Sequence, residues 1–309
     1  MKRLFKYFTP SRARFDSPAL NERIVRTKIG GKNYDIGSDD NYLEHIKGEF
    51  EPEMVVLFKS LIRPHDTVLD IGANIGCTSI LFGNLAKKVY SFEPSPTTYS
   101  YLEKNIQRAQ LERVTPVNVG LGKESGMFEL TFSESDRSGG FVSNLTSAST
   151  GHQVEQIKII KGDDFINEGS VAKVDFIKID VEGFEKSVIE GLSTTIIRDQ
   201  PIVVLELNHW CLNALQRTSV PDFFDFLRSV FPHLYAVDMR YVRNLKDKIR
   251  RKLLPSFYDV KDAKNLHDPN ASYHVMNRHI LNGFSYPILV GAFDTAQLAT
   301  FSSTVGIKI

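Results

Sequence analysis

The chain has 309 residues, of which 42% are hydrophobic and 24% are charged, and its formal net charge is +1. This length and composition suit a globular protein with a sizeable core, most simply one large α/β domain with extensions. The small net charge excludes a global field that would attract nucleic acid, so none is expected as a partner. The only cysteines, Cys77 and Cys211, offer neither a disulfide framework nor a zinc-ligand spacing, which indicates a reducing compartment.

The first fifty residues are expected to form an arm, a hairpin and a cap. Residues 1–20 are basic and aromatic and contain two prolines, which is typical of a loosely held arm. They lack an apolar core of signal-peptide length, so we expect a cytoplasmic protein. Alternating residues on either side of Gly30 and Gly31 predict a hairpin. Helical spacing of apolar residues between Asn41 and Ile62 predicts two helices, the second starting at Pro52, that can roof a ligand site.

The segment from Thr67 to Gly76 (TVLDIGANIG) organises the rest of the chain. Its apolar first half predicts a parallel strand buried on both faces, and the small residues that follow let backbone N–H groups approach a ligand. A helix should begin near Cys77. A dinucleotide-binding turn would need glycines at positions 74 and 77, where this chain has Asn74 and Cys77, so a nicotinamide oxidoreductase is disfavoured.

A second short apolar strand is predicted within Lys88–Pro94, and its last residue is an acid. Glu93 lies about twenty residues beyond the glycine turn, the spacing at which nucleoside-binding βαβ units place an acid that receives the ribose hydroxyls. Pro94 follows it. An amphipathic helix is predicted from Thr97 to Ala109, and a third strand from Val114 to Val119.

The middle of the chain departs from the alternation of strands and helices. Residues Met127–Phe132 read as an inserted strand, and Ser133–Gly151 as a polar loop that either closes over an acceptor or only covers the surface. A short strand follows at Ile157–Ile160. The fourth and fifth core strands are predicted at Val174–Asp180 and Pro201–Leu207, and their carboxyl ends present acids to one crevice.

The last third supplies the remaining elements of a predicted seven-stranded, doubly wound, mainly parallel α/β sheet. We expect a helix at Pro221–Phe231, a sixth strand at Leu234–Met239 and a seventh at Tyr286–Val290. Residues Arg240–Leu254 predict a basic amphipathic helix, which either packs with a solvated face or docks peripherally on an anionic membrane or glycolipid. We divide the chain into 1–50, a ligand-binding domain at 51–240, and an extension at 241–309 packed on it.

These segments together resemble a known family. The residues around Asp70 (DIGAN), those leading to Glu93 and Pro94 (SFEP), and those from Asp175 to Gly183 (DFIKIDVEG) are similar to the FkbM family of S-adenosylmethionine-dependent class I methyltransferases. The resemblance runs from about Glu51 to Asn208. It implies a Rossmann-like fold and S-adenosylmethionine as cofactor.

The resemblance also implies roles for individual residues. In the D-x-G-x-x-x-G turn, Gly72 and Gly76 leave room for the amino-acid part of the cofactor. Many class I methyltransferases read the adenine amino group with an acid after the third strand, where this chain has glycines. Asn118 or the backbone around Leu121 is then expected to read the base. The residues expected to bind the cofactor are Asp70, Gly72, Asn74, Gly76, Glu93, Pro94, Asn118, Leu121 and Asp180.

Methyl transfer to a hydroxyl needs a group that takes up the acceptor proton. Our candidates are Asp180, Glu182, Glu206 and His209, which follow the fourth and fifth strands. Lys178 alternates onto the same strand face as Asp180 and is expected to form a salt bridge to an inner acid. Acids at these strand ends also hold a divalent metal in some O-methyltransferases, but no third certain ligand is present and we assign no metal.

The family resemblance implies the reaction better than the acceptor. We favour O-methylation of a saccharide or glycan hydroxyl. The alternatives are O-methylation of a secondary metabolite, and a non-catalytic scaffold that binds S-adenosylmethionine. The oligomeric state cannot be predicted from these patterns.

Overall fold

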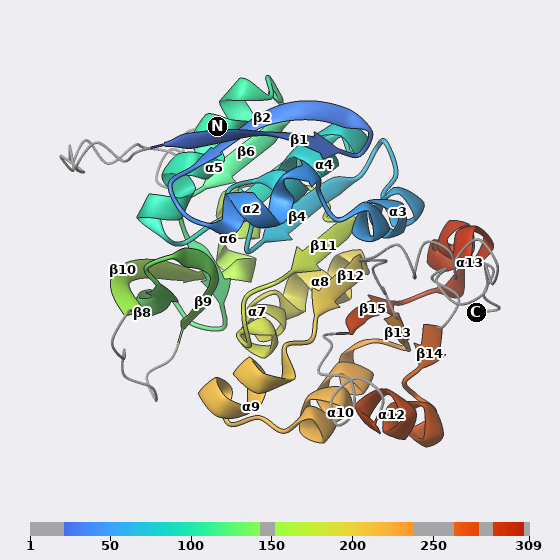
Figure 1. The fold of residues 1–309 in the computed structure, drawn as a ribbon. Coiled ribbons are helices and arrows are strands. Elements are labelled where there is room, and N and C mark those ends of the chain that lie inside the picture. Colours follow the sequence, from blue (N-terminus) through green and yellow to red (C-terminus); the bar gives the residue numbers. More distant parts are fainter. Residues whose placement is uncertain (1–21, 143–151, 238–262, 278–286, 306–309) are drawn as a thin grey trace.

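The protein is described by a computed structural model that covers residues 22–142, 152–237, 263–277 and 287–305. Its centre is a mainly parallel sheet with helices on both faces (Figure 1). The strands run in the order β14-β13-β15-β12-β11-β4-β5-β6. Their bounds are β4 (Thr67–Ile71), β5 (Lys88–Phe92), β6 (Val114–Val117), β11 (Phe176–Ile179), β12 (Ile202–Glu206), β13 (His233–Val237), β14 (Ala263–Asn265) and β15 (Ile288–Ala292).

This sheet confirms the predicted doubly wound α/β fold, with one correction. The expected seven strands are present, and β15 runs antiparallel between β12 and β13. An eighth strand, β14, pairs antiparallel with the outer edge of β13. The prediction missed β14 because it spans only three residues and two of them are polar, so it carries no period that a sequence pattern can detect.

The two faces of the sheet bury separate hydrophobic cores. On β4, Val68 belongs to one core, whereas Leu69 and Ile71 belong to the other, as expected when successive side chains point to opposite faces. The first core is covered by α3 (Pro52–Leu61), α4 (Cys77–Leu85), α5 (Pro96–Arg108) and, after η3 (Thr295–Leu298), α13 (Ala299–Val305). The second is covered by α6 (Gly162–Glu168), α7 (Glu185–Gly191), α8 (Ser193–Asp199), α9 (His209–Gln216), α10 (Val220–Val230) and α12 (Pro269–Val275).

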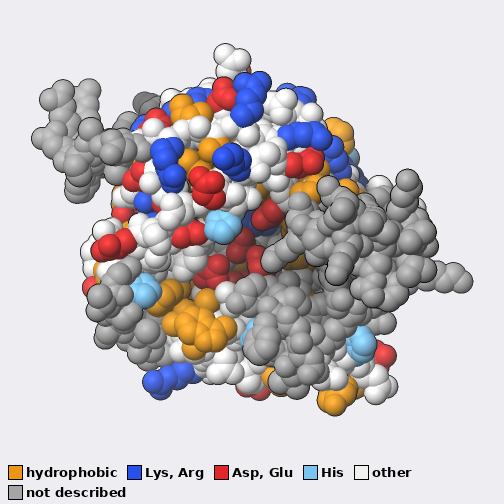
Figure 2. All heavy atoms as spheres, viewed as in Figure 1, with side chains coloured by type: hydrophobic (Ala, Val, Ile, Leu, Met, Phe, Trp, Pro, Cys, Tyr) orange, Lys and Arg blue, Asp and Glu red, His pale blue; other side chains and the backbone are white. Residues whose placement is uncertain are grey.

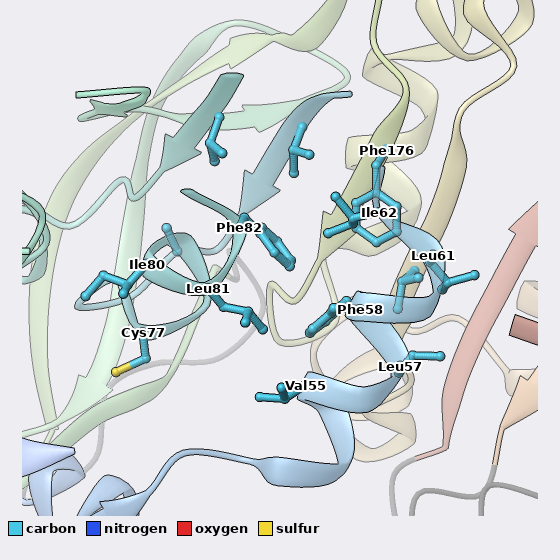
Figure 3. Packing of buried hydrophobic residues seen from close by; sticks show 14 of the residues in the cluster. Val55, Leu57, Phe58, Leu61, Ile62, Cys77, Ile80, Leu81, Phe82 and Phe176 are labelled. Carbon is cyan, nitrogen blue, oxygen red and sulfur yellow. The ribbon is translucent and has the colours of Figure 1, made fainter. Parts of the chain in front are cut away.

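Three phenylalanines tie the first core together. Phe58 of α3, Phe82 of α4 and Phe176 of β11 approach one another edge to face (Figure 3), with ring centroids 4.8 to 6.1 Å apart. All three are buried. Because edge-to-face pairs add to the free energy of burial, this cluster fixes the amino-terminal helix α3 against the sheet.

The amino-terminal elements confirm the predicted hairpin and helices. β1 (Arg23–Ile29) and β2 (Lys32–Ser38) pair antiparallel, and α2 (Tyr42–Ile46) and β3 (Gly48–Glu49) precede α3. The turn is possible because Gly30 and Gly31 both have positive φ angles. The side chain of Asn105 on α5 bonds the backbone N–H and carbonyl of Gly37, which docks the hairpin on the core.

The inserted segment forms a second sheet, in the order β7-β10-β8-β9. Its strands are β7 (Gly120–Gly122), β8 (Gly126–Ser133), β9 (Asp136–Val142) and β10 (His152–Lys161). The prediction of a polar loop from Ser133 is therefore wrong over β9, where Leu130 pairs with Val142 and Arg137 forms an ion pair with Asp40. The Asp40 partner of Arg137 is distant in sequence, and the segment itself is mostly polar. Its composition therefore suggested a loop.

Several predictions lie outside the described residues, namely the arm at 1–20, the rest of the predicted loop at 143–151 and the basic helix at Arg240–Leu254. Within the described ranges, every helix is too short or too polar to cross a bilayer. The proposed division of the chain into three regions stays a prediction.

Candidate functional site

A cavity of about 370 Å³ opens at the carboxyl ends of β4, β5, β11 and β12. Helices α2 and α3 contribute Tyr42 and Met54 to its wall, and the second sheet contributes Leu130, Phe132 and Ile157. Figure 2 shows acidic side chains gathered in a hollow near the middle of one face of the molecule. Among the predicted site residues, those lining the cavity are Gly72, Asn74, Glu93, Pro94, Leu121, Asp180, Glu182 and Glu206.

The glycine turn after β4 forms the floor of this cavity. Gly72 and Ala73 donate their backbone N–H groups to the carbonyl of Phe92 at 3.1 and 3.0 Å. Gly72 has a φ of 78°, and a Cβ placed on it would lie 1.8 Å from the Asp180 carbonyl oxygen. Only glycine fits there, because both the backbone conformation and the neighbouring strand end exclude a side chain.

Glu93 extends from the end of β5 beside that turn. One carboxylate oxygen accepts from the backbone N–H of Asn74 at 3.1 Å, and the other accepts from that of Ser95 at 3.0 Å. The side chain is only 7% exposed, and burial raises its pKa to about 7 although the two N–H bonds oppose that rise. Because a carboxylate offers about four acceptor positions, each oxygen keeps one for a ligand hydroxyl.

Lys178 confirms the predicted salt bridge from the middle of β11. Its Nζ lies 3.6 Å from Asp70 Oδ1 and 3.3 Å from Asp180 Oδ2, and it donates to the Gly72 carbonyl at 2.9 Å. Burial lowers the pKa of Lys178, but Asp180 and Asp70 outweigh burial and hold the pKa above its ordinary value. The lysine thus stays charged and joins the glycine turn to the end of β11.

Carboxylates from three elements face the same space. Burial and the charges of Asp180 and Glu182 raise the pKa of Glu206 to about 9, and burial with the charge of Asp180 raises that of Glu51 to about 7. Burial also raises the pKa of Glu182, whose Oε2 accepts from Asn208 Nδ2 at 2.6 Å. Such mutual shifts occur when carboxyl groups share a site of low polarity.

Other predicted site residues do not line the cavity. Asp70 is fully buried beneath the turn, where it accepts from Ser79 Oγ at 2.6 Å and pairs with Lys178. A Cβ on Gly76 would meet Leu102 Cδ1 at 2.8 Å, so this glycine serves helix packing. The structure therefore places both residues in support of the turn and away from the ligand space.

Asn118 and His209 also lie outside the cavity lining. The Asn118 amide donates to the carbonyls of Glu93 and Pro94 at 2.9 and 3.2 Å, which engages both of its N–H groups. His209 begins α9 and lies outside the cavity lining, and burial lowers its pKa. The structure leaves the carboxylates as the candidate bases on the cavity wall. In the described residues no group of three or more His, Cys, Asp or Glu side chains is arranged to hold a metal ion.

Tyr42 of α2 lines the cavity, as expected for a helix that roofs the site. Glu51 and Arg137 were not predicted from the sequence, and they line the cavity at the N-cap of α3 and from β9. Glu51 precedes Pro52 and adopts a positive φ of 32° as the N-cap of α3. Pro52 marked only a helix start, and Arg137 stood in an apparent loop. No motif could have found them, because they reach the cavity through tertiary contacts.

Comparison with known proteins agrees with this arrangement. The model of the methyltransferase FkbM domain matches residues 70–237, which include the glycine turn, Glu93 and the acids after β11 and β12. The chain belongs to the FkbM methyltransferase family. Within the matched domain, Gly120 and Leu121, which begin β7 shortly after β6, line the cavity.

Two curated relatives of this FkbM-family chain match over part of their length. Hexuronic acid methyltransferase AglP of Haloferax volcanii is 30% identical over 51% of this chain and 62% of its own. The 31-O-demethyl-FK506 methyltransferase FkbM of Streptomyces tacrolimicus is 29% identical over 42% of this chain and 61% of its own. The chain thus spans less than two thirds of each relative.

Solved structures include the methyltransferase FkbM from Methylobacillus flagellatus KT, which is 18% identical to this chain. The two superpose with a TM-score of 0.40 over 63% of this chain and 52% of that one. Precorrin-6y C5,15-methyltransferase from Geobacter metallireducens is 14% identical, with a TM-score of 0.43 over 80% of this chain and 89% of its own.

Proposed function

We propose that this chain is an S-adenosylmethionine-dependent O-methyltransferase that acts on a saccharide hydroxyl. The observation that carries the proposal is the shared cavity, in which the Gly72 turn and Glu93 face the carboxylates that follow β11 and β12. The name of the AglP relative supports a saccharide acceptor. The name of the FkbM relative favours the alternative, a hydroxyl of a secondary metabolite.

The residues present fit the cofactor. Both Glu93 oxygens are positioned by backbone N–H groups and retain acceptor capacity, as two ribose hydroxyls require. The turn presents backbone without side chains at Gly72, and Pro94 and Leu121 offer apolar surface for a base. S-adenosylmethionine, when bound, supplies an electrophilic methyl group next to carboxylates that favour its positive charge.

The protein's own contribution is to orient the acceptor, exclude water and remove a proton. The apolar side chains of Leu130, Phe132 and Ile157 shield the cavity from one side. Positioning of this kind can lower the barrier by several kcal/mol. Among the candidate bases we assign proton uptake to Asp180, because it lines the cavity, Lys178 holds its Oδ2 at 3.3 Å, and its side chain remains 38% exposed.

Titration calorimetry of the full chain tests the proposal at the cofactor. We expect binding of S-adenosylmethionine and none of NADH, because the glycine turn lacks the fingerprint of a dinucleotide site. Binding of NADH alone would refute the proposal. Transfer of a labelled methyl group to glycan fractions then distinguishes an enzyme from a scaffold that only binds the cofactor.

We expect the affinity for S-adenosylmethionine to weaken as the pH falls below about 7. Glu93 has a pKa of about 7, and its protonated form has lost part of the acceptor capacity that binds hydroxyls. The pKa is raised in the protein, so the binding form predominates above this value and is lost as pH decreases, up to about tenfold per pH unit. Calorimetry between about pH 5.5 and 7 measures this slope. If the affinity of Glu93→Gln changes with pH as steeply as that of the wild type, the pH dependence belongs to another group, such as Glu51.

We expect Asp180→Asn to lower the turnover number about 10²- to 10⁴-fold, the usual contribution of a general base. The isosteric amide keeps the side-chain volume but cannot take up a proton at neutral pH. The matched control is His209→Asn. It removes the imidazole that was also predicted as a base but lies outside the cavity lining. Labelled-methyl assays at saturating substrate compare the two. A larger loss in His209→Asn than in Asp180→Asn would contradict the assignment.

A further inference from the structure

The wall of the cavity around Asp180 is unusually rich in carboxyl groups. Asp180 and Glu182 follow β11, Glu206 ends β12, and Glu51 occupies the N-cap position of α3. Burial, and after it the charges of neighbouring acids, raises the pKa of Glu51, Glu182 and Glu206, because closely placed carboxyl groups repel one another when they are ionised. A further negative charge placed among them would therefore meet repulsion.

The basic side chains on the described part of the cavity wall are already paired. Lys178 lies against Asp70 and Asp180 and donates to a backbone carbonyl. Arg137 forms ion pairs with Asp39 and Asp40, and its side chain is 8% exposed. Each cation thus already faces two acidic side chains.

Desolvation adds to this electrostatic preference. Moving a carboxylate from water into a partly buried site is unfavourable unless a cation pairs with it. A neutral hydroxyl has no such cost and can donate to any of the carboxylates. An ammonium group would gain ion pairs with Glu182 and its neighbours.

Within the proposed methyl transfer, we propose that the pocket selects a saccharide acceptor with no negative charge beside its reacting hydroxyl. Neutral and amine-bearing sugars enter, and uronic acids are excluded. This inference rests on the proposed function and narrows its acceptor class. It separates this chain from the hexuronic acid that appears in the name of the AglP relative.

The test uses matched sets of methyl glycosides built on glucose, galactose and mannose. Each set contains the neutral glycoside, its 2-amino form and its uronic acid form, and binding to the full chain with S-adenosylhomocysteine is measured at pH 8 by saturation-transfer NMR. We expect the neutral and amino members of at least one set to bind, and its uronic acid to bind at least about tenfold more weakly. A uronic acid that binds as tightly as its neutral counterpart overturns the inference.

Charge-removing variants test the cause. Glu51→Gln and Glu182→Gln should each reduce the ratio between the affinities for the amino and the uronic acid forms. The double variant should reduce this ratio about tenfold. The control Glu129→Gln removes an acid of β8 that bonds Gln156 outside the cavity lining, and should change nothing. An unchanged ratio in variants that still bind S-adenosylhomocysteine also overturns the inference. The inference is also overturned if no glycoside binds. In that case the titration with S-adenosylmethionine shows whether the proposed function fails as well.

Discussion

Glu93→Gln is expected to weaken S-adenosylmethionine binding about 10²-fold. Two hydroxyl donors that meet a carboxylate form charge-assisted hydrogen bonds, each of which contributes about 1.5–3 kcal/mol. The amide keeps one acceptor oxygen and turns its NH₂ group toward either the Asn74 or the Ser95 N–H, which lie at 3.1 and 3.0 Å from the present oxygens. Affinity should be measured by calorimetry above pH 7, where the wild-type carboxylate is charged.

The control for this substitution must separate binding from folding. A buried N–H that loses its acceptor costs about 1–3 kcal/mol, so Glu93→Gln should also melt at a lower temperature. Glu93→Asp keeps the charge on a shorter side chain, and Glu129→Gln makes the same chemical change outside the cavity lining. If Glu93→Gln is folded and binds the cofactor within about threefold of Glu129→Gln, the ribose role of Glu93 is wrong.

Lys178→Met is expected to destabilise the fold by about 3–5 kcal/mol. The substitution preserves most of the side-chain volume but leaves Asp70, which is fully buried, without its cation. It also removes the donor that holds the Gly72 carbonyl. Removing one partner of a buried pair costs more than the pair contributes, because the remaining charge stays desolvated. Thermal unfolding should shift down by about 10 °C.

Lys173→Met provides a matched comparison near the other end of the same strand. Lys173 pairs with Asp175 at 2.8 Å, but its side chain is 62% exposed, and such surface pairs contribute about 0–1 kcal/mol. Equal melting temperatures for the two variants would show that the buried cluster is not what holds the turn. A folded Lys178→Met should still bind S-adenosylmethionine more weakly than Lys173→Met, because the Gly72 turn loses its anchor.

These two predictions concern different parts of the same site. Glu93 faces the ligand space, whereas Lys178 and Asp70 lie behind the turn and determine where that space begins. A residue of the motif can therefore matter for the site without contacting a ligand. Asp70 illustrates this, because it belongs to the matched family segment and yet is fully buried.

Much of the core could be predicted from local patterns. The run Val68 to Ile71 marked a strand buried on both faces, and the positive φ of Gly72 and Gly76 accounts for glycine at both positions. Strand period and glycine conformation depend on neighbouring residues, so they can be read from sequence. β14 and β9 could not be predicted in this way. One is a three-residue edge strand and the other a polar strand, and both are held by pairing with other strands.

Local sequence patterns were enough to predict the core strands and helices along the chain, the glycine turn and the acids at the strand ends. Tertiary contacts, in contrast, bring Glu51 and Arg137 to the cavity and leave Asn118 and His209 outside its lining. The charge of the site also depends on the tertiary structure. Burial, together with the nearby charges of Asp180 and Glu182, raises the pKa of Glu206 to about 9. Proton affinity depends on distances through space and on access to water, and residues adjacent in sequence specify neither.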